Sequence, residues 1–200
     1  MKKVAIIGFG PGWTQYPQDY DGEVWSLNMG AVLLPRIDKL FLADKLADKT
    51  SIRKGWYEVI LGPDRREKVP ITEEGYKGII AQKGLPFISC HPYPDVPTYE
   101  PYPLREIVDH FGGPPSAYFA NCIAYMLAYA IWKQYEEIEV WGVIQGMMTE
   151  YAFHKGSIEF WLGIALGRGI GIKIAGESRL LKTFNNKLYG FNKPIEELIK

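Results

Sequence analysis

Three glycines follow the first apolar run of the chain at a spacing of two residues. Gly8, Gly10 and Gly12 come directly after Val4–Ile7, a run of β-branched and aliphatic residues. Because glycine has no Cβ, the backbone can turn sharply here and approach a ligand closely. A turn of this kind after a buried first strand is the usual phosphate position of a doubly wound nucleotide-binding sheet. The pattern therefore predicts a nucleotide phosphate at this turn; the alternative is a tight turn without a ligand.

The turn departs from the established nucleotide fingerprints. Trp13 occupies the position where the pattern G-x-G-x-x-G requires its third glycine. The next apolar run ends in Asn28, not in the acidic residue that holds a ribose, and no Gly-Lys-Ser/Thr follows the turn. These departures disfavour NAD, FAD and P-loop ATP hydrolysis. They favour a mononucleotide held by the turn, including Phe9 and Pro11, and by asparagine amides such as that of Asn28.

Other polar residues and glycines follow the remaining apolar runs. Ligands of open α/β sheets bind beyond the carboxyl ends of the strands. Asp44 ends the third run and could meet a metal, a ribose or an acceptor, and Gly142 lies at the end of a later run. Asn121 lies near the start of the most apolar stretch, where its amide could donate to a phosphate or ribose, or could cap a helix.

Histidines supply the candidate bases. An imidazole has an unperturbed pKa near neutrality, so it can take a proton from a reacting hydroxyl. His154 lies just before an expected helix and is the first candidate, with a surface histidine as the alternative; His91 is the second candidate and His110 is assigned a structural role. None of the three forms a metal-type pair, and Cys90 and Cys122 lack such spacing, so no metal site is predicted.

The expected elements place these residues in one Rossmann-like α/β domain spanning residues 1–200. Its sheet should be mostly parallel, with helices on both faces. The patterns predict strands over residues 4–7, 23–28, 39–44, 85–90, 138–143 and 170–174. They predict helices over residues 29–34, 51–57, 72–83, 104–111, 117–135 and 157–166.

Two regions interrupt this pattern. Residues 45–115 are interpreted as a divergent insertion that shapes an acceptor site, and they contain an irregular arm, His91–Pro103, with five prolines and three tyrosines. Residues 178–200 form a polar C-terminal tail. The arm and the six tryptophans of the chain suggest an oligomer surface, so a homo-oligomer is expected.

Composition limits the remaining classes. The chain carries 23 basic and 23 acidic residues, and this zero net charge argues against a general grip on nucleic acid. No apolar stretch reaches about 18 residues, so no membrane span is expected. Two cysteines and a first strand that starts at the N-terminus indicate a reduced, cytoplasmic protein.

Two blocks of the chain resemble the bacterial sialyltransferases that use CMP-activated sialic acid. In the first block, Gly8–Gly12 is similar to the Gly-x-Gly-Pro-Ser turn of that family, and Asn28 to the Asn of its Cys-Asn strand end. The second block contains Asn121–Ala128, Tyr135–Gly142 and Tyr151–Phe153, which resemble a helix start, a strand and a Tyr-Ala-Phe motif of the family. Gly12 departs from the family's serine, and residues 45–115 show no match.

Other groups share parts of this pattern. The glycine-proline turn is similar to that of archaeal hydroxymethylpterin pyrophosphokinase-like proteins. Uncharacterised phage proteins resemble the chain more closely, through Trp-x-Leu-Asn, Leu-Pro-Arg and Trp-Gly-Val segments.

The sialyltransferase resemblance implies a transferase that binds a nucleotide or nucleotide-activated sugar, with Tyr151 added to the binding residues and His154 as general base. The pterin-enzyme resemblance implies an alternative, a phosphoryl or pyrophosphoryl transferase using ATP and Mg²⁺, for which Asp44 is the one well-placed carboxylate. A third alternative is a non-catalytic nucleotide-binding or assembly protein of phage origin. The sialyltransferase resemblance implies no firm cofactor, whereas the phosphoryl-transfer alternative implies Mg²⁺.

Overall fold

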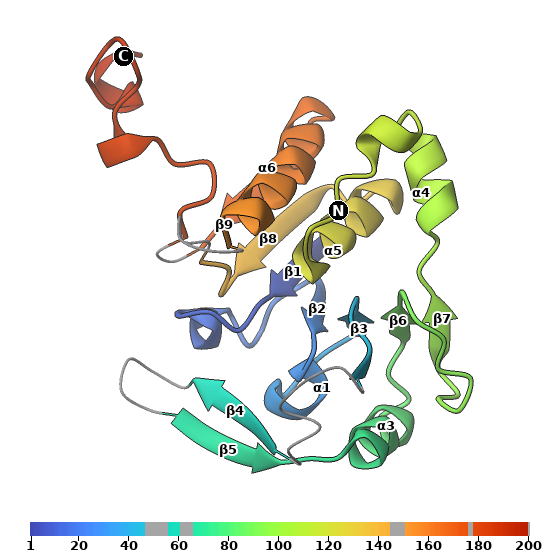
Figure 1. The fold of residues 1–200 in the computed structure, drawn as a ribbon. Coiled ribbons are helices and arrows are strands. Elements are labelled where there is room, and N and C mark those ends of the chain that lie inside the picture. Colours follow the sequence, from blue (N-terminus) through green and yellow to red (C-terminus); the bar gives the residue numbers. More distant parts are fainter. Residues whose placement is uncertain (47–55, 61–65, 145–150, 176–177, 200) are drawn as a thin grey trace.

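Seven strands form one parallel sheet in the order β7-β6-β3-β2-β1-β8-β9 (Figure 1). The computed structural model describes residues 1–46, 56–60, 66–144, 151–175 and 178–199. The strands of the sheet are β1 (Lys3–Ile7), β2 (Glu23–Leu27), β3 (Lys39–Leu42), β6 (Phe87–Ser89), β7 (Tyr99–Pro101), β8 (Glu137–Trp141) and β9 (Gly171–Ile174). A separate antiparallel hairpin is formed by β4 (Trp56–Ile60) and β5 (Arg66–Pro70).

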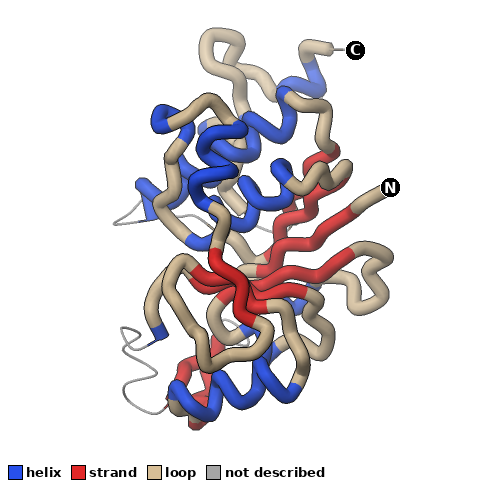
Figure 2. Tube along the Cα trace, turned by 90° about the vertical axis from the view of Figure 1, so that its right-hand side faces the viewer, coloured by secondary structure: helices blue, strands red, loops and turns tan. Residues whose placement is uncertain are grey.

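Helices cover both faces of the sheet. Figure 2, turned by 90° from Figure 1, shows the strands between helices above and below. The helices are α1 (Gly30–Leu33), α3 (Glu73–Gln82), α4 (Leu104–His110), α5 (Cys122–Trp132) and α6 (Tyr151–Gly167). The expected Rossmann-like α/β class is therefore confirmed.

The first strand is buried on both faces, as its unbroken apolar run predicts. Val4 and Ile6 pack into the cluster that contains α5 and the buried side of α6, whereas Ala5 and Ile7 pack on the opposite face. All four are 0% exposed. Because side chains alternate along a strand, this pattern requires a layer on each side of the sheet centre.

The central helix is shorter than expected. Residues 117–135 were predicted to be helical, but α5 spans Cys122–Trp132. Asn121 is extended (φ −166°, ψ 167°), and its Oδ1 accepts a hydrogen bond from the backbone N–H of Ala124. An amide cap at this position starts the helix, so the apolar residues before it lie outside α5.

Two other expected boundaries are wrong. Helix α6 begins at Tyr151, not near Ser157, so His154 lies within its first turn; Gly156 does not break the helix. A helix was expected over residues 51–57, of which 51–55 lie outside the described residues. Trp56 and Tyr57 belong to β4, where aromatic and β-branched residues favour a strand.

The proline-rich arm contributes to the sheet. Tyr99–Pro101 pairs in parallel with β6 as the edge strand β7, where the missing N–H of a proline is tolerated. Tyr93 and Val96 of the arm are buried against the α3 side of the sheet. Strands β6 and β7 thus come from residues 45–115, and the acceptor role assigned to this region stays a prediction.

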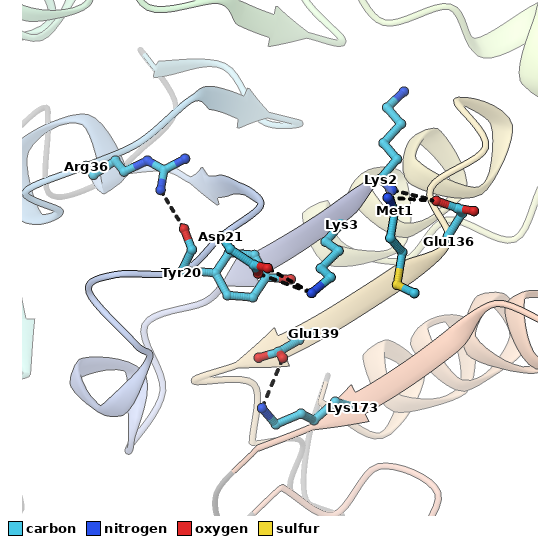
Figure 3. Close-up of polar contacts among 9 residues, drawn as sticks. All are labelled: Met1, Lys2, Lys3, Tyr20, Asp21, Arg36, Glu136, Glu139 and Lys173. Carbon is cyan, nitrogen blue, oxygen red and sulfur yellow. Dashed lines mark hydrogen bonds and ion pairs between the residues drawn. The ribbon is translucent and has the colours of Figure 1, made fainter.

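Polar contacts between side chains join β1, β8 and β9 to neighbouring segments (Figure 3). The Lys3 ammonium binds the Asp21 carboxylate at 2.9 Å, and this hydrogen bond lowers the pKa of Asp21. Glu139 of β8, only 5% exposed, accepts a hydrogen bond of 3.0 Å from Lys173 of β9. The first contact joins β1 to the segment before β2, and the second joins β8 to β9.

The last part of the chain leaves the body of the domain, as Figure 1 shows for the segment after β9. The described residues 178–199 contain only short 3₁₀ turns, and Ser178 and Leu180 at the start of this segment are buried. Among the residues that the structure describes, no helix is both long and apolar enough to span a bilayer.

Candidate functional site

The chain order in the sheet reverses between β1 and β8. From β1 the chain adds β2, β3, β6 and β7 on one side, and then returns to place β8 and β9 on the other. In a doubly wound sheet the ligand site lies at this switch point, beyond the carboxyl ends of the strands. The glycine turn follows β1 and Gly142 follows β8, so both lie at this position.

The glycines of the turn contact the backbone that follows β8. The N–H of Gly8 donates to the carbonyl of Trp141 at 2.8 Å, and the N–H of Gly10 donates to the carbonyl of Gly142 at 2.7 Å. A Cβ added at Gly8 or Gly10 would lie 2.8 Å from the Gly142 oxygen. Both positions therefore need glycine because two backbone segments approach each other, whether or not a ligand is bound.

Gly142 and Trp13 complete this contact. Gly142 has φ +61°, and a Cβ there would lie 2.5 Å from both the Gly8 oxygen and the Trp13 Cβ. The indole of Trp13 is buried, and Phe9 packs edge-on against it at 5.2 Å. Trp13, which replaces the third glycine of the dinucleotide pattern, thus closes the turn by packing.

The open side of the turn is at Pro11 and Gly12. Pro11 is exposed. Gly12 has φ +84°, and the nearest atom to a Cβ added there is a Gln15 side-chain oxygen at 3.8 Å. Of the expected phosphate-binding glycines, Gly12 is the one where an added Cβ would make no contact shorter than 3.8 Å.

Asn28 follows β2 on the same edge of the sheet. Its φ is +48°, a left-handed conformation that asparagine tolerates better than most residues. Its backbone N–H donates to the Phe41 carbonyl at 3.3 Å, while no hydrogen bond of its side-chain amide is found within the described part of the chain. A half-buried amide on a strained backbone at a strand end is the kind of feature found at binding sites.

Helices α5 and α6 are joined where both begin. Asn121 Nδ2 donates to the His154 carbonyl at 3.1 Å and to Ser157 Oγ at 3.2 Å. Ser157 is 0% exposed; its hydroxyl donates to the same carbonyl at 3.2 Å and accepts from the Ala120 N–H at 3.3 Å. We call Asn121, His154 and Ser157 the α5–α6 clasp.

The clasp changes the interpretation of Asn121. The capping alternative is confirmed, and the amide hydrogens that were expected to reach a phosphate or ribose contact α6 instead. Its direct contact with a ligand stays a prediction. Ser157 was missed by the sequence analysis, and its only local signal is its position three residues after His154 on one helix face.

A second group lies beyond β3 and β6. Cys90 is exposed as a residue, yet protein atoms around its sulfur raise the pKa of the thiol to about 11. A hydrogen bond from Tyr125 opposes this rise, and the charge of the exposed Asp44 adds to it. Burial likewise raises the pKa of Tyr125 to about 12. Tyr125, in the first turn of α5, is a neighbour of Asp44 and Cys90 that the sequence did not reveal.

The structure thus places the expected residues in separate groups at the carboxyl ends of the strands. Gly8, Gly10 and Gly142 are in contact, and Asn121 is in contact with His154. The backbone N–H of His91 donates to Ser89 Oγ at 3.1 Å at the end of β6. Tyr151 begins α6. Among the described residues, no group of three or more His, Cys, Asp or Glu side chains is arranged to hold a metal ion.

Comparisons with known proteins concern the fold. No family model and no curated protein matches the chain, so neither supports the resemblance to pterin pyrophosphokinase-like or phage proteins. The chain is similar to the sialyltransferase CstII from Campylobacter jejuni in complex with cytidine-5'-monophosphate, with 16% identity over 98% of this chain and 87% of that chain and a TM-score of 0.51. CstII with CMP-3FNeuAc matches at 16% identity over 87% of this chain and 80% of that chain, with a TM-score of 0.53. A CST-II variant with CMP matches at 16% identity over 90% of this chain and 84% of that chain, with a TM-score of 0.54.

Substitution of the glycines is expected to separate packing from ligand contact. Gly10→Ala should lower the free energy of unfolding by about 1–3 kcal/mol because its Cβ meets the Gly142 carbonyl. Gly142→Ala should cost more, since it adds a left-handed φ to two close contacts. Gly12→Ala should cost only about 1–2 kcal/mol, the strain of its positive φ. Urea denaturation of the three variants measures the order, and equal stability of Gly142→Ala and wild type would refute the packing role.

The clasp can be tested with two substitutions at one position. Asn121→Asp keeps an oxygen for the Ala124 N–H but removes both amide hydrogens, so it should lose about 1 kcal/mol of stability. Asn121→Ala also removes the cap and should lose about 2 kcal/mol. A double-mutant cycle with Ser157→Ala should show coupling, because the two side chains share a hydrogen bond. Additive losses in chemical denaturation would mean that the clasp does not act as a unit.

The raised pKa of Cys90 predicts slow alkylation. Only the thiolate reacts, and a pKa of about 11 leaves little thiolate at pH 8. The iodoacetamide rate of Cys90 at pH 8 should be roughly 10-fold below that of the unfolded chain, and should rise until the pH passes about 11. Tyr125→Phe should slow it further, because the Tyr125 hydrogen bond lowers the pKa. Peptide mapping in a Cys122→Ser background measures the rate; a native rate equal to the unfolded one would contradict this assignment.

Proposed function

We propose that this chain is a transferase that binds a nucleotide-activated sugar beyond the carboxyl ends of β1, β2 and β8. The main support for the proposal is the glycine turn at the switch point. Gly8 and Gly10 bind the backbone that follows β8, while Gly12 beside them makes no close contact at its Cβ position. The fold likeness to CMP-bound sialyltransferases over 98% of the chain supports the same ligand class and makes CMP the first nucleotide to test.

The residues around this point have distinct proposed roles. The backbone N–H of Gly12 would face the donor phosphate, because a Cβ added at Gly12 would meet no atom closer than 3.8 Å. The side-chain amide of Asn28 would bind the ribose or base. Asn121 would hold α6 in place, since its amide hydrogens bind the His154 carbonyl and the Ser157 hydroxyl.

Both helices of the clasp begin at the carboxyl ends of the strands. Helix α5 precedes β8 and α6 follows it, so the N-terminal end of each lies on the ligand side of the sheet. The N-terminus of a helix carries a partial positive charge that favours anions. This arrangement would stabilise the negative charge that develops on the nucleotide as it leaves.

In the proposed reaction an acceptor hydroxyl attacks the anomeric carbon of the sugar. The new carbon–oxygen bond forms from the acceptor, and the bond to the nucleotide phosphate breaks with its electron pair on the phosphate oxygen. His154 would take the acceptor proton, because it lies in the first turn of α6 at the ligand side of the sheet. His91, after β6, is the second candidate for this base.

Two substitutions should separate the residues that bind the donor from the residue that takes the proton. His154→Ala should lower turnover of the donor by about 10²–10⁴-fold while donor affinity stays within a factor of about 3, because a general base acts on the proton transfer. Asn28→Gly keeps the left-handed backbone but removes the amide, so it should weaken the donor without loss of stability. Nucleotide affinity is measured by thermal shift with CMP, UDP, GDP and ATP and their sugar conjugates, and turnover by release of the free nucleotide.

His91→Ala is the matched control for His154→Ala. Full turnover in His154→Ala together with a large loss of turnover in His91→Ala would assign the role of general base to His91. No thermal shift with any nucleotide or nucleotide sugar would overturn the proposed function as a whole.

A further inference from the structure

Large apolar side chains of the C-terminal segment are turned to solvent. Tyr189 is fully exposed and Phe191 is 67% exposed, and the same segment also exposes Leu181, Ile195 and Ile199. The segment leaves the body of the domain after β9, so these side chains lie outside its core (Figure 1). Exposed apolar side chains that gather on one segment mark an interaction surface.

The two exposed aromatic residues lie within a closed loop. The backbone N–H of Leu188 donates to the Lys193 carbonyl, and the N–H of Asn192 donates to the Leu188 carbonyl, both at 2.9 Å. Gly190 at φ +86° and Asn192 at φ +54° adopt the left-handed conformations that a tight turn needs. These hydrogen bonds hold the two aromatic residues at the tip. We call residues 188–193 the tail loop.

The start of the segment is fixed to the body of the domain. Ser178 is 1% exposed and Leu180 is 2% exposed, and Leu180 packs into the core cluster that contains α5 and the buried side of α6. The backbone N–H of Leu181 donates to the Glu159 carboxylate of α6 at 2.6 Å. The tail loop therefore follows an anchored start.

The same segment is locally basic. Residues 178–193 contain four basic residues and no acidic residue, whereas the whole chain carries 23 of each kind. The two acidic residues of the segment come later, after Pro194. Lys187 precedes the tail loop and Lys193 ends it, so a lysine stands at each foot of the loop with the aromatic tip between them. The four basic residues, all exposed, are Arg179, Lys182, Lys187 and Lys193.

We propose that the tail loop docks on a membrane surface that contains anionic lipids. Aromatic side chains partition into the boundary between headgroups and acyl chains, and clustered lysines are attracted to anionic headgroups. A lysine can bury its alkyl stem there while its ammonium stays among the phosphates. A protein surface fits less well, because lysine is depleted at protein–protein interfaces. This inference goes beyond the proposed function and is independent of nucleotide binding.

Co-sedimentation of the full chain with lipid vesicles tests the proposal. Vesicles of phosphatidylcholine with about 30% phosphatidylserine are compared with vesicles of phosphatidylcholine alone. The wild-type chain should bind the anionic vesicles at least about 10-fold more tightly. The difference should shrink as salt rises from about 0.05 M to about 0.5 M, because added ions screen the lysine charges.

Two double substitutions separate the tip of the loop from its feet. Tyr189→Ser with Phe191→Ser should weaken binding to the anionic vesicles by about 10-fold or more, because less apolar area enters the membrane. Lys187→Gln with Lys193→Gln should weaken it by about 5-fold for each charge removed, since each cation near an anionic surface contributes separately.

Matched controls come from the body of the domain. Leu104→Ser removes an apolar side chain of α4 that is 45% exposed, and Arg105→Gln with Lys133→Gln removes two exposed charges. Both controls should bind the anionic vesicles as the wild-type chain does. If the charge control weakened binding as much as the loop variant, the attraction would belong to the whole surface and the tail loop would lose its role.

Phe191→Trp supplies a variant that keeps an aromatic tip. It should retain vesicle binding, and its added indole should shift its emission to shorter wavelength on anionic vesicles, read as the difference from the wild-type spectrum. Leu104→Trp is the control and should show no such shift. An unshifted Phe191→Trp emission in vesicle-bound protein would mean that the tip does not enter the membrane, which overturns the proposal.

Other outcomes would also overturn the proposal. They are equal binding to the two vesicle types, no binding to either, or wild-type binding by the tip variant. A wild-type oligomer that dissociates on substitution of the tip, in place of vesicle binding, would assign the tail loop to a contact between copies; sedimentation velocity without lipid measures this. Binding of a single-stranded oligonucleotide that is lost in the same variant, without vesicle binding, would assign it to nucleic acid.

Discussion

The approach of two backbone segments at the switch point determines the geometry at the carboxyl ends of β1 and β8. The turn after β1 and the chain after β8 are joined by hydrogen bonds of 2.8 and 2.7 Å, and side chains at Gly8, Gly10 or Gly142 would prevent that approach. With these strands locked in register, the helix that precedes β8 and the helix that follows it must both begin beside the turn. The positions of the clasp and of His154 follow from this one contact.

The hydrogen bonds of the clasp then fix the start of α6 relative to the start of α5. Asn121 starts α5 through its oxygen and binds α6 through its nitrogen, and the buried Ser157 completes the same set of hydrogen bonds. A buried polar group stabilises a unique arrangement only when its hydrogen bonds are made, and here the two side chains satisfy each other. The first turn of α6 therefore holds the backbone of His154 in a fixed relation to the N-terminus of α5.

The sequence predicted most of the sheet, because short, continuous runs of β-branched and aliphatic residues such as Val4–Ile7 are typical of strands buried on both faces. It also predicted the glycine turn, but it assigned Gly10 to a ligand when the closest neighbour is the Gly142 carbonyl, a contact between residues 132 positions apart that no local pattern reports. The start of α6 was placed near Ser157 but lies at Tyr151, and the Tyr118 hydroxyl occupies the space beside Gly156 within the helix. Tyr125 and Ser157 were missed for the same reason: their partners come from other elements.

The central claim is that a nucleotide binds where the β1 turn meets β8, and amide NMR mapping tests it most directly. Titration of the labelled protein with CMP should shift the backbone amides of Phe9, Gly10, Gly12 and Asn28 first, with smaller changes at the starts of α5 and α6 and none at the far end of α6 near Leu166. A saturable shift confined to other parts of the surface, or no saturable shift with CMP, UDP, GDP or ATP, would contradict the account.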